Sequence, residues 1–112
     1  MLESLKNKLE YYQITNFTID EITMGRKIPE QLLWNILPTI RVLQELRSKY
    51  DKPIFINSSY RSPAYNKLVR GKKKSLHLDF NAIDFTVEHK EDLTSLFLQL
   101  DIWDKEYHFK FL

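Results

Sequence analysis

The segment Ser75-Leu76-His77-Leu78-Asp79-Phe80-Asn81-Ala82-Ile83-Asp84 decides how this chain is interpreted, because it sets an imidazole and a carboxylate seven residues apart. His77 offers a neutral ring nitrogen and Asp84 an anionic oxygen. A catalytic zinc ion takes three such protein ligands and keeps its fourth position for water. The chain has no cysteine, which excludes disulfides and thiolate metal sites. His77 and Asp84 are therefore predicted to be two ligands of a zinc site.

A second motif lies upstream, in the run Ile56-Asn57-Ser58-Ser59-Tyr60-Arg61-Ser62-Pro63-Ala64-Tyr65-Asn66. It reads as a strand entering a turn that places Arg61 beside the same region. Together the two segments resemble the zinc D-Ala-D-Ala carboxypeptidase family, whose fold is shared with the hedgehog signalling domain and with many phage endolysins. The family pattern is Ser-x-His-x-x-Gly-x-Ala-x-Asp, and the chain departs from it at Phe80, where glycine is usual. Asn81 tolerates a positive φ better than most residues and could supply that turn conformation instead.

The resemblance extends from Phe17 to Phe85 and, through Glu106-Tyr107-His108-Phe109-Lys110-Phe111, to the family strand that carries the last zinc ligand. It implies that His108 is the third ligand, although a ligand beyond Leu112 stays an alternative. The family's catalytic carboxylate usually stands three residues before this histidine, where the chain has Lys105. Glu106 is the candidate general base, with Asp104 as the alternative, and both are expected to project from the His108 face of a strand.

Two further residues receive roles from the resemblance. Arg61 is expected to face the substrate and to hold a carboxylate or a polarised carbonyl oxygen, although it could instead bond carbonyl groups in its own turn. Ser75 is a candidate hydrogen-bond partner of the substrate or of a metal ligand, and otherwise a turn hydroxyl. His89 is expected to face solvent near a helix start. The basic run Arg70 to Lys74 is either a solvated loop or a surface that attracts an anionic wall polymer.

Length and composition fit one globular domain spanning residues 1–112, with 43% hydrophobic residues and a net charge of +2. That charge is too small to indicate a nucleic-acid partner, and no apolar run has the length of a membrane span. We expect a monomer whose partner is a peptidoglycan peptide. The first dozen residues lack the apolar core of a signal peptide, so the chain is expected to be made in the cytoplasm and to act on the cell wall as a phage lysis or virion protein.

The apolar periodicity predicts an α+β fold in which N-terminal helices pack on a small, mainly antiparallel sheet. Helices are expected over the first dozen residues, from Pro29 onward with a kink or division at Pro38, from a Ser62 cap, and over Glu91 to Leu100. Strands are expected at Ile54 to Ile56, Ala82 to Val87 and Tyr107 to Phe111.

These observations predict a zinc-dependent metallopeptidase that cleaves the peptide part of peptidoglycan. The resemblance covers both D,D-carboxypeptidases and L-alanyl-D-glutamate endopeptidases, and the sequence does not choose between their bonds. The alternative is a non-catalytic cell-wall-binding or virion structural module that keeps the peptidase fold.

Overall fold

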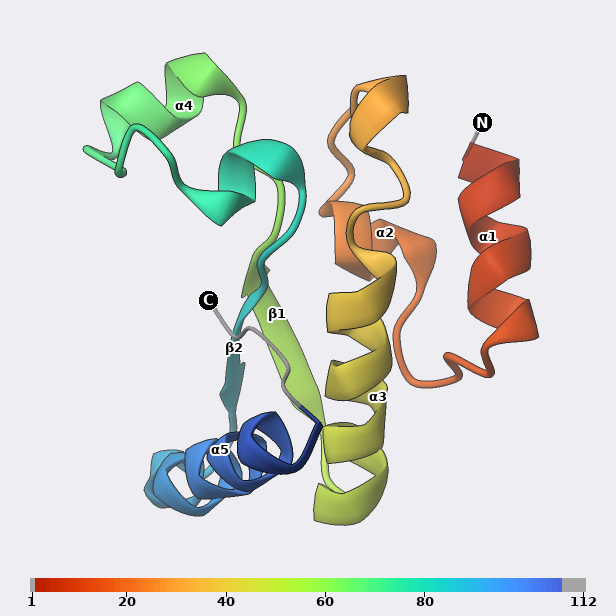
Figure 1. Ribbon diagram of the computed structural model, residues 1–112, viewed down its shortest axis with the longest axis vertical. Helices are drawn as coiled ribbons and strands as arrows, with labels where there is room; N and C mark the ends of the chain where they lie inside the picture. The colour runs from red at the N-terminus through yellow and green to blue at the C-terminus, as the bar shows by residue number, and fades with distance from the viewer. Residues whose placement is uncertain (1, 108–112) are drawn as a thin grey trace.

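Helix α3 stands at the centre of the computed structural model, with the two-stranded sheet on one side and the N-terminal helices on the other (Figure 1). The structure describes residues 2–107. In chain order the elements are α1 (Leu2–Tyr11), α2 (Ile19–Thr23), η1 (Glu30–Leu32), α3 (Leu37–Tyr50), β1 (Ile54–Ser58), α4 (Pro63–Leu68), η2 (Leu76–Asp79), β2 (Asp84–Val87), η3 (Lys90–Asp92) and α5 (Leu93–Tyr107). The predicted α+β class is confirmed. None of the described helices is long and apolar enough to cross a bilayer.

The helices predicted over the first dozen residues and after the Ser62 cap are confirmed, and the one predicted from Pro29 is a 3-10 turn over Glu30–Leu32 before α3. Leu5 and Leu9 bury the apolar stripe of α1 in the core. Pro38 divides the second predicted helix, because a proline without an N–H is tolerated only in the first helical turn, and α3 begins there. Ser62 caps α4 by accepting a hydrogen bond from the Tyr65 amide at 3.1 Å.

Strands β1 and β2 form an antiparallel pair that carries Asp84 at one end. Ile54 pairs with Val87 and both are buried, whereas Ser58 pairs with Asp84 after an irregularity that follows Ile56. The predicted second strand is therefore shorter than expected, because ladder pairing begins only at Asp84. Asp84 lies at the end of the sheet where β1 leads into the Ser59–Arg61 segment.

Helix α5 corrects the predicted end of the chain. It continues to Tyr107, so the strand expected from Tyr107 is wrong at that residue, and residues 108–111 of the expected strand lie outside the described residues. Asp104 and Glu106 therefore lie on a helix and not on a strand. Residues two apart on a helix point about 200° apart, so these two carboxylates do not share a face. Asp104 is half-buried and Glu106 is exposed.

The turn between η2 and β2 corrects a second expectation. Phe80 itself takes the left-handed conformation, with φ 55° and ψ 44°, and Asn81 does not supply it. A side chain in this region costs roughly 1–2 kcal/mol of backbone strain, which glycine would avoid. The Phe80 ring is fully buried and meets the Tyr60 ring edge to face at 6.4 Å between centroids. Burying such a ring stabilises by about 1.5–3 kcal/mol, so burial outweighs the strain.

We expect Phe80→Ala to lower the free energy of unfolding by about 3–5 kcal/mol, the usual cost of emptying a phenylalanine site in a core. Phe80→Gly should be about 1 kcal/mol less damaging than Phe80→Ala, because only glycine also relieves the positive φ. Urea unfolding of the two variants measures the difference. Leu46, fully buried inside α3, is the matched control, where glycine should be worse than alanine by about 1 kcal/mol. A glycine variant less stable than the alanine variant at position 80 would contradict the strain argument.

Candidate metal and substrate site

The short helix η2 carries His77 and is held in place from both sides. Ser75 caps it, since the Ser75 hydroxyl accepts a hydrogen bond from the His77 amide at 3.2 Å. From the start of α3 and the loop before it, Asn35 donates to the Asp79 carbonyl at 2.9 Å and Thr39 to the Asn81 carbonyl at 3.5 Å. The position of His77 is therefore fixed by the central helix.

The orientation of the His77 ring is fixed by the chain segment that follows β1. The ring is almost fully buried, and its Nδ1 atom lies 2.6 Å from the carbonyl oxygen of Ser59, a fully buried residue. A carbonyl oxygen can only accept, so Nδ1 carries the proton and donates it. In a neutral ring this leaves the lone pair on Nε2, as in histidines that bind a metal through that atom.

The free nitrogen of His77 points at Asp84. Nε2 lies 3.2 Å from Asp84 Oδ2, and the aspartate side chain is 53% exposed. Two ligands of a tetrahedral zinc ion, each about 2.0–2.1 Å from the metal, stand about 3.3 Å apart. The separation, the ligand types and the imposed tautomer all fit zinc, and solvent reaches the pair from the Asp84 side.

Arg61 completes this cluster. Its Nη2 atom lies 3.8 Å from the same Asp84 Oδ2, and its backbone amide donates to the His77 carbonyl at 3.0 Å. The guanidinium therefore contacts the carboxylate and not the carbonyl groups of its own turn. Backbone and side-chain contacts together hold the segments 59–61 and 75–77 side by side.

Asn66 and Gly71 support Arg61, and our sequence analysis gave neither of them a role. The buried Asn66 side chain donates to the Lys72 carbonyl at 2.9 Å, and its Oδ1 accepts from Arg61 Nη1 at 3.5 Å. Gly71 donates its amide to the Asn66 carbonyl at 2.8 Å, and a Cβ on Gly71 would lie 2.0 Å from Asn66 Oδ1. The signal was available in the sequence, because Asn66 ends the motif that contains Arg61 and the chain has only two glycines.

The other predicted site residues are not brought to this cluster within residues 2–107. His108 lies outside the described residues, and across the described ranges no group of three or more His, Cys, Asp or Glu could hold a metal. Helix α5, which carries Asp104 and Glu106, packs on α3 and η3 at the end of the sheet away from α4 (Figure 1). His89 is exposed before η3, as expected.

A surface pocket of about 830 Å³ lies elsewhere, between α3, the loop after α1 and Trp103. Arg41, Gln44 and Glu45 are among its lining residues, and none of the predicted metal or substrate residues is. The Gln44 side chain in this lining is already engaged, because its Oε1 accepts from the Thr15 and Asn16 amides at 3.1 and 3.0 Å. The chemistry of the His77 cluster therefore does not extend into this pocket.

Comparison with known protein families identifies one match. The family Peptidase M15 matches residues 10–102, which include both motifs and most of the chain. Neither the curated proteins nor the solved structures yielded a significant match.

We expect Gly71→Ala to destabilise the native protein, because its methyl group would collide with Asn66 Oδ1. The cost should fall by about 1 kcal/mol or more in an Asn66→Ala background, where that oxygen is gone. Urea unfolding of the wild type, both single variants and the double variant gives the coupling. Gly25→Ala is the control, since Gly25 has φ +69° but nothing within 4 Å of its Cβ position, and Asn66→Ala should not change its cost. If Gly71→Ala lowered the free energy of unfolding equally in both backgrounds, contact with Asn66 Oδ1 would not be the cause of the destabilisation.

Proposed function

The chain belongs to the peptidase M15 family, and on that premise we propose that it is a zinc-dependent peptidase that cleaves the peptide part of bacterial peptidoglycan. The observation that supports this proposal most directly is the convergence of His77 Nε2 and Arg61 Nη2 on one oxygen of Asp84, at 3.2 and 3.8 Å. A ligand pair with an adjacent guanidinium supplies two of the components of metal-assisted peptide hydrolysis, part of the metal shell and a cation for the substrate.

In this proposal His77, Asp84 and His108 hold the zinc ion. Zinc bound there would lower the pKa of a water molecule to about 7 and polarise the peptide carbonyl. The contribution of His77 is prepared before the metal arrives, because the Ser59 carbonyl already fixes its tautomer. Asp84 keeps its side chain open to solvent, which provides the entry path for metal and substrate.

Arg61 is proposed to bind the substrate. Its planar fork can hold a carboxylate through two parallel hydrogen bonds or stabilise the oxygen on which charge develops. Asn66 steadies the guanidinium from behind, and the Arg61 side chain is 21% exposed, so one side remains accessible. Ser75 is proposed to act mainly on the metal ligand, since its hydroxyl already contacts the His77 amide.

The proton transfer step needs a base, for which Glu106 remains our candidate and Asp104 the alternative. Both lie on α5, so their access to the site depends on how the chain continues after Tyr107. We further propose that the protein is made in the cytoplasm and acts on the cell wall as a phage lysis or virion protein. The cleaved bond is that of a D,D-carboxypeptidase or of an L-alanyl-D-glutamate endopeptidase.

A second candidate function is a non-catalytic wall-binding or virion structural module with the peptidase fold. Lys105 favours it, because it occupies the position of the family's usual catalytic carboxylate and instead pairs with Asp101 at 3.1 Å. Metal content and hydrolysis separate the two candidates.

We expect His77→Ala and Asp84→Ala each to abolish stoichiometric zinc binding, because each removes one of the two ligands that the fold places together. His108→Ala should weaken zinc far more than His89→Ala, since His89 is exposed and lies near Glu91 instead. Elemental analysis and chelator competition on purified protein measure both effects. Unchanged zinc in the His77 or Asp84 variant would disprove the ligand assignment, and equal effects at His108 and His89 would place the third ligand elsewhere.

Hydrolysis of purified muropeptides should be detectable by mass spectrometry, which also identifies the bond. Arg61→Ala should lower turnover about 100-fold while zinc stays bound, as expected for loss of one charged donor at the reacting oxygen. In the same assay Glu106→Gln should lose activity about 100-fold with zinc retained if Glu106 is the base.

Asp104→Asn is the matched control for the base. If this change is the damaging one, the base is Asp104. If the wild type and both variants are inert while zinc is bound, the module replaces the enzyme as the proposed function. Loss of zinc in Arg61→Ala would make that residue structural.

A further inference from the structure

Positive charge is concentrated in one part of the chain. Residues 52–78 contain Lys52, Arg61, Lys67, Arg70, Lys72, Lys73 and Lys74 and not a single Asp or Glu. The whole chain, by contrast, has 17 basic and 15 acidic residues. The sequence alone left open whether this run is a solvated loop or an interaction surface. We call residues Lys67–Lys74 the basic arm.

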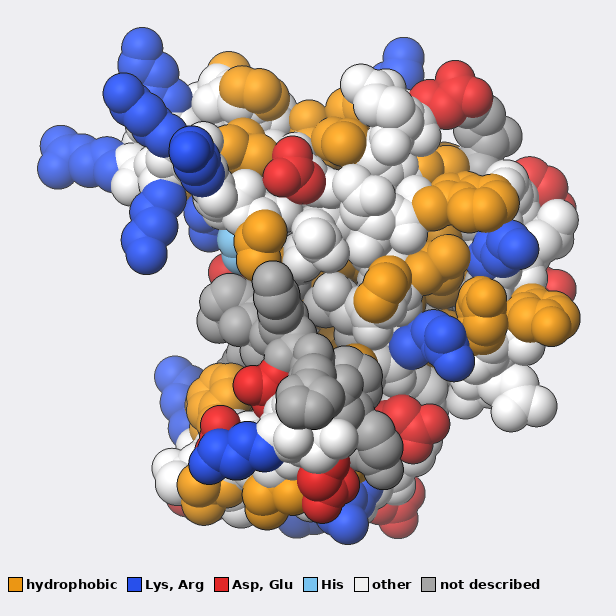
Figure 2. All heavy atoms as spheres, in the orientation of Figure 1, with side chains coloured by type: hydrophobic (Ala, Val, Ile, Leu, Met, Phe, Trp, Pro, Cys, Tyr) orange, Lys and Arg blue, Asp and Glu red, His pale blue; other side chains and the backbone are white. Residues whose placement is uncertain are grey.

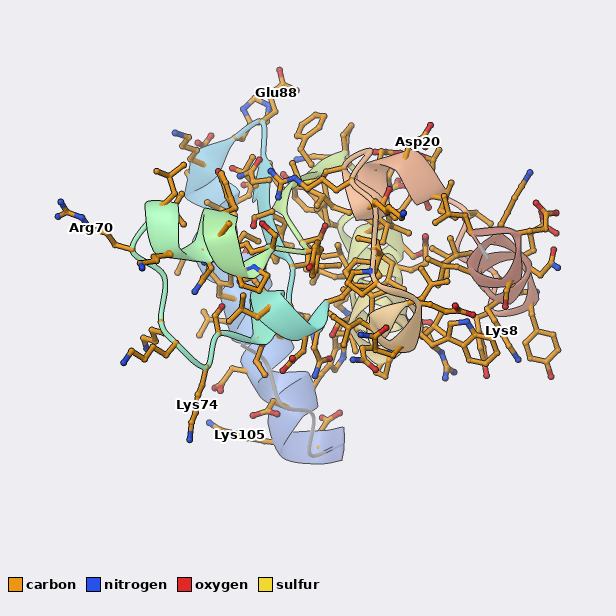
Figure 3. The ribbon with its side chains drawn as sticks, turned by 90° about the horizontal axis from the view of Figure 1, so that it is seen from above. Lys8, Asp20, Arg70, Lys74, Glu88 and Lys105 are labelled. Atoms are coloured by element: carbon orange, nitrogen blue, oxygen red, sulfur yellow. The ribbon has the colours of Figure 1, made fainter. Side chains whose placement is uncertain are left out.

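The basic arm projects from the body of the protein, and among residues 2–107 none of its charges is paired with a carboxylate. All five of its Lys and Arg residues are exposed, and the salt bridges among residues 2–107 involve other basic groups. Figure 2 shows these blue side chains fanning out at one corner of the molecule. In the view from above, Arg70 and Lys74 point outward from the loop and away from each other (Figure 3). The cations therefore present a spread of charge and not a pocket shaped for one small anion.

The basic arm is fixed relative to the candidate site. Asn66 links the Lys72 carbonyl to the Arg61 guanidinium, and Ser75, which donates its amide to the Lys72 carbonyl at 3.1 Å, caps the helix that carries His77. A polymer that lies along the arm would thus be held beside Arg61 and Asp84. Gly71 lies close against Asn66 at the root of the arm and donates its amide to the Asn66 carbonyl.

We propose that the basic arm is a docking surface for an anionic polymer of the bacterial wall, carrying phosphodiester or carboxylate groups, and that it delivers the attached peptide to the site. This inference rests on the proposed function. Lysine ammonium groups act as hydrated point charges that suit repeated anions without fixed geometry. A bilayer is the less suitable partner, because Leu68 and Val69 are the arm's only apolar side chains and membrane-surface helices need a longer apolar face.

The test is co-sedimentation of the intact zinc-loaded protein with purified sacculi for a few minutes at 4 °C, with released peptides measured in the same supernatant. The arm variant is Lys72→Gln/Lys73→Gln/Lys74→Gln. The matched control is Lys6→Gln/Lys49→Gln/Lys90→Gln, which removes the same charge from exposed lysines elsewhere. Wild type and control should bind alike, and the arm variant about tenfold or more weakly. Raising salt from about 50 to 200 mM should weaken wild-type binding about tenfold or more if three or more anions are engaged.

Two further measurements identify the anion and the class of partner. Loss of binding after the covalently attached phosphate polymer is stripped from the sacculi assigns phosphodiesters, and retained binding assigns the carboxylates of the peptides. Equal binding by the arm and control variants overturns the proposal. So does tighter, arm-dependent binding to vesicles containing 30% phosphatidylglycerol (about one charge in three lipids) or to duplex DNA. Arm-dependent binding without released peptides would support the docking surface and contradict the proposed peptidase function.

Discussion

The hydrogen bond from His77 Nδ1 to the Ser59 carbonyl is the interaction on which the candidate site depends. It joins the end of β1 to η2 inside the core, where leaving either partner unsatisfied would cost about 1–3 kcal/mol. The Arg61 amide repeats the connection by donating to the His77 carbonyl. With both bonds made, the imidazole, the guanidinium and the strand end that bears Asp84 have one arrangement. A shift of η2 would break both bonds together, so the His77 ring and the Arg61 side chain are positioned as a unit.

Phe80 shows how the fold replaces the residue that its family prefers. The family's glycine would make the left-handed turn without strain but would leave the space beside Tyr60 empty. Here the strained residue fills that space with a fully buried ring, and the ring packs behind the very segment that contains Ser59 and Arg61. The left-handed turn is thus stabilised by burial of the Phe80 ring, whereas a glycine would adopt it without strain. The fold therefore accommodates phenylalanine in place of glycine, and His77 Nε2 and Asp84 Oδ2 still lie 3.2 Å apart.

Local sequence signals were sufficient where one segment determines its own structure. The leucine spacing of α1, the proline at the start of α3 and the Ser62 cap act within a few residues, and all three were predicted. The predictions failed where distant contacts decide. Phe80 takes its φ because Tyr60 and the core surround its ring, and α5 continues past Leu100 because Leu96, Leu100 and Trp103 pack against that core. An alternating pattern near residue 107 favoured a strand, and helix packing overrode it.

The charges around Asp84 bear on the kind of substrate that the site would accept. Without metal, the Asp84 carboxylate lies against the His77 ring and the Arg61 guanidinium, so its negative charge is already offset by that of Arg61. A zinc ion held by Asp84 and two neutral histidines would leave a net charge of about +2 once Arg61 is counted, and the carboxylate proposed as the base would lower it to about +1. A substrate group that lies beside the zinc ion and Arg61 would therefore bind best when it is anionic. The nearby basic arm adds to the same positive potential. A peptide with a free carboxylate next to its scissile bond meets this requirement, whereas an uncharged internal peptide bond would leave the excess charge uncompensated.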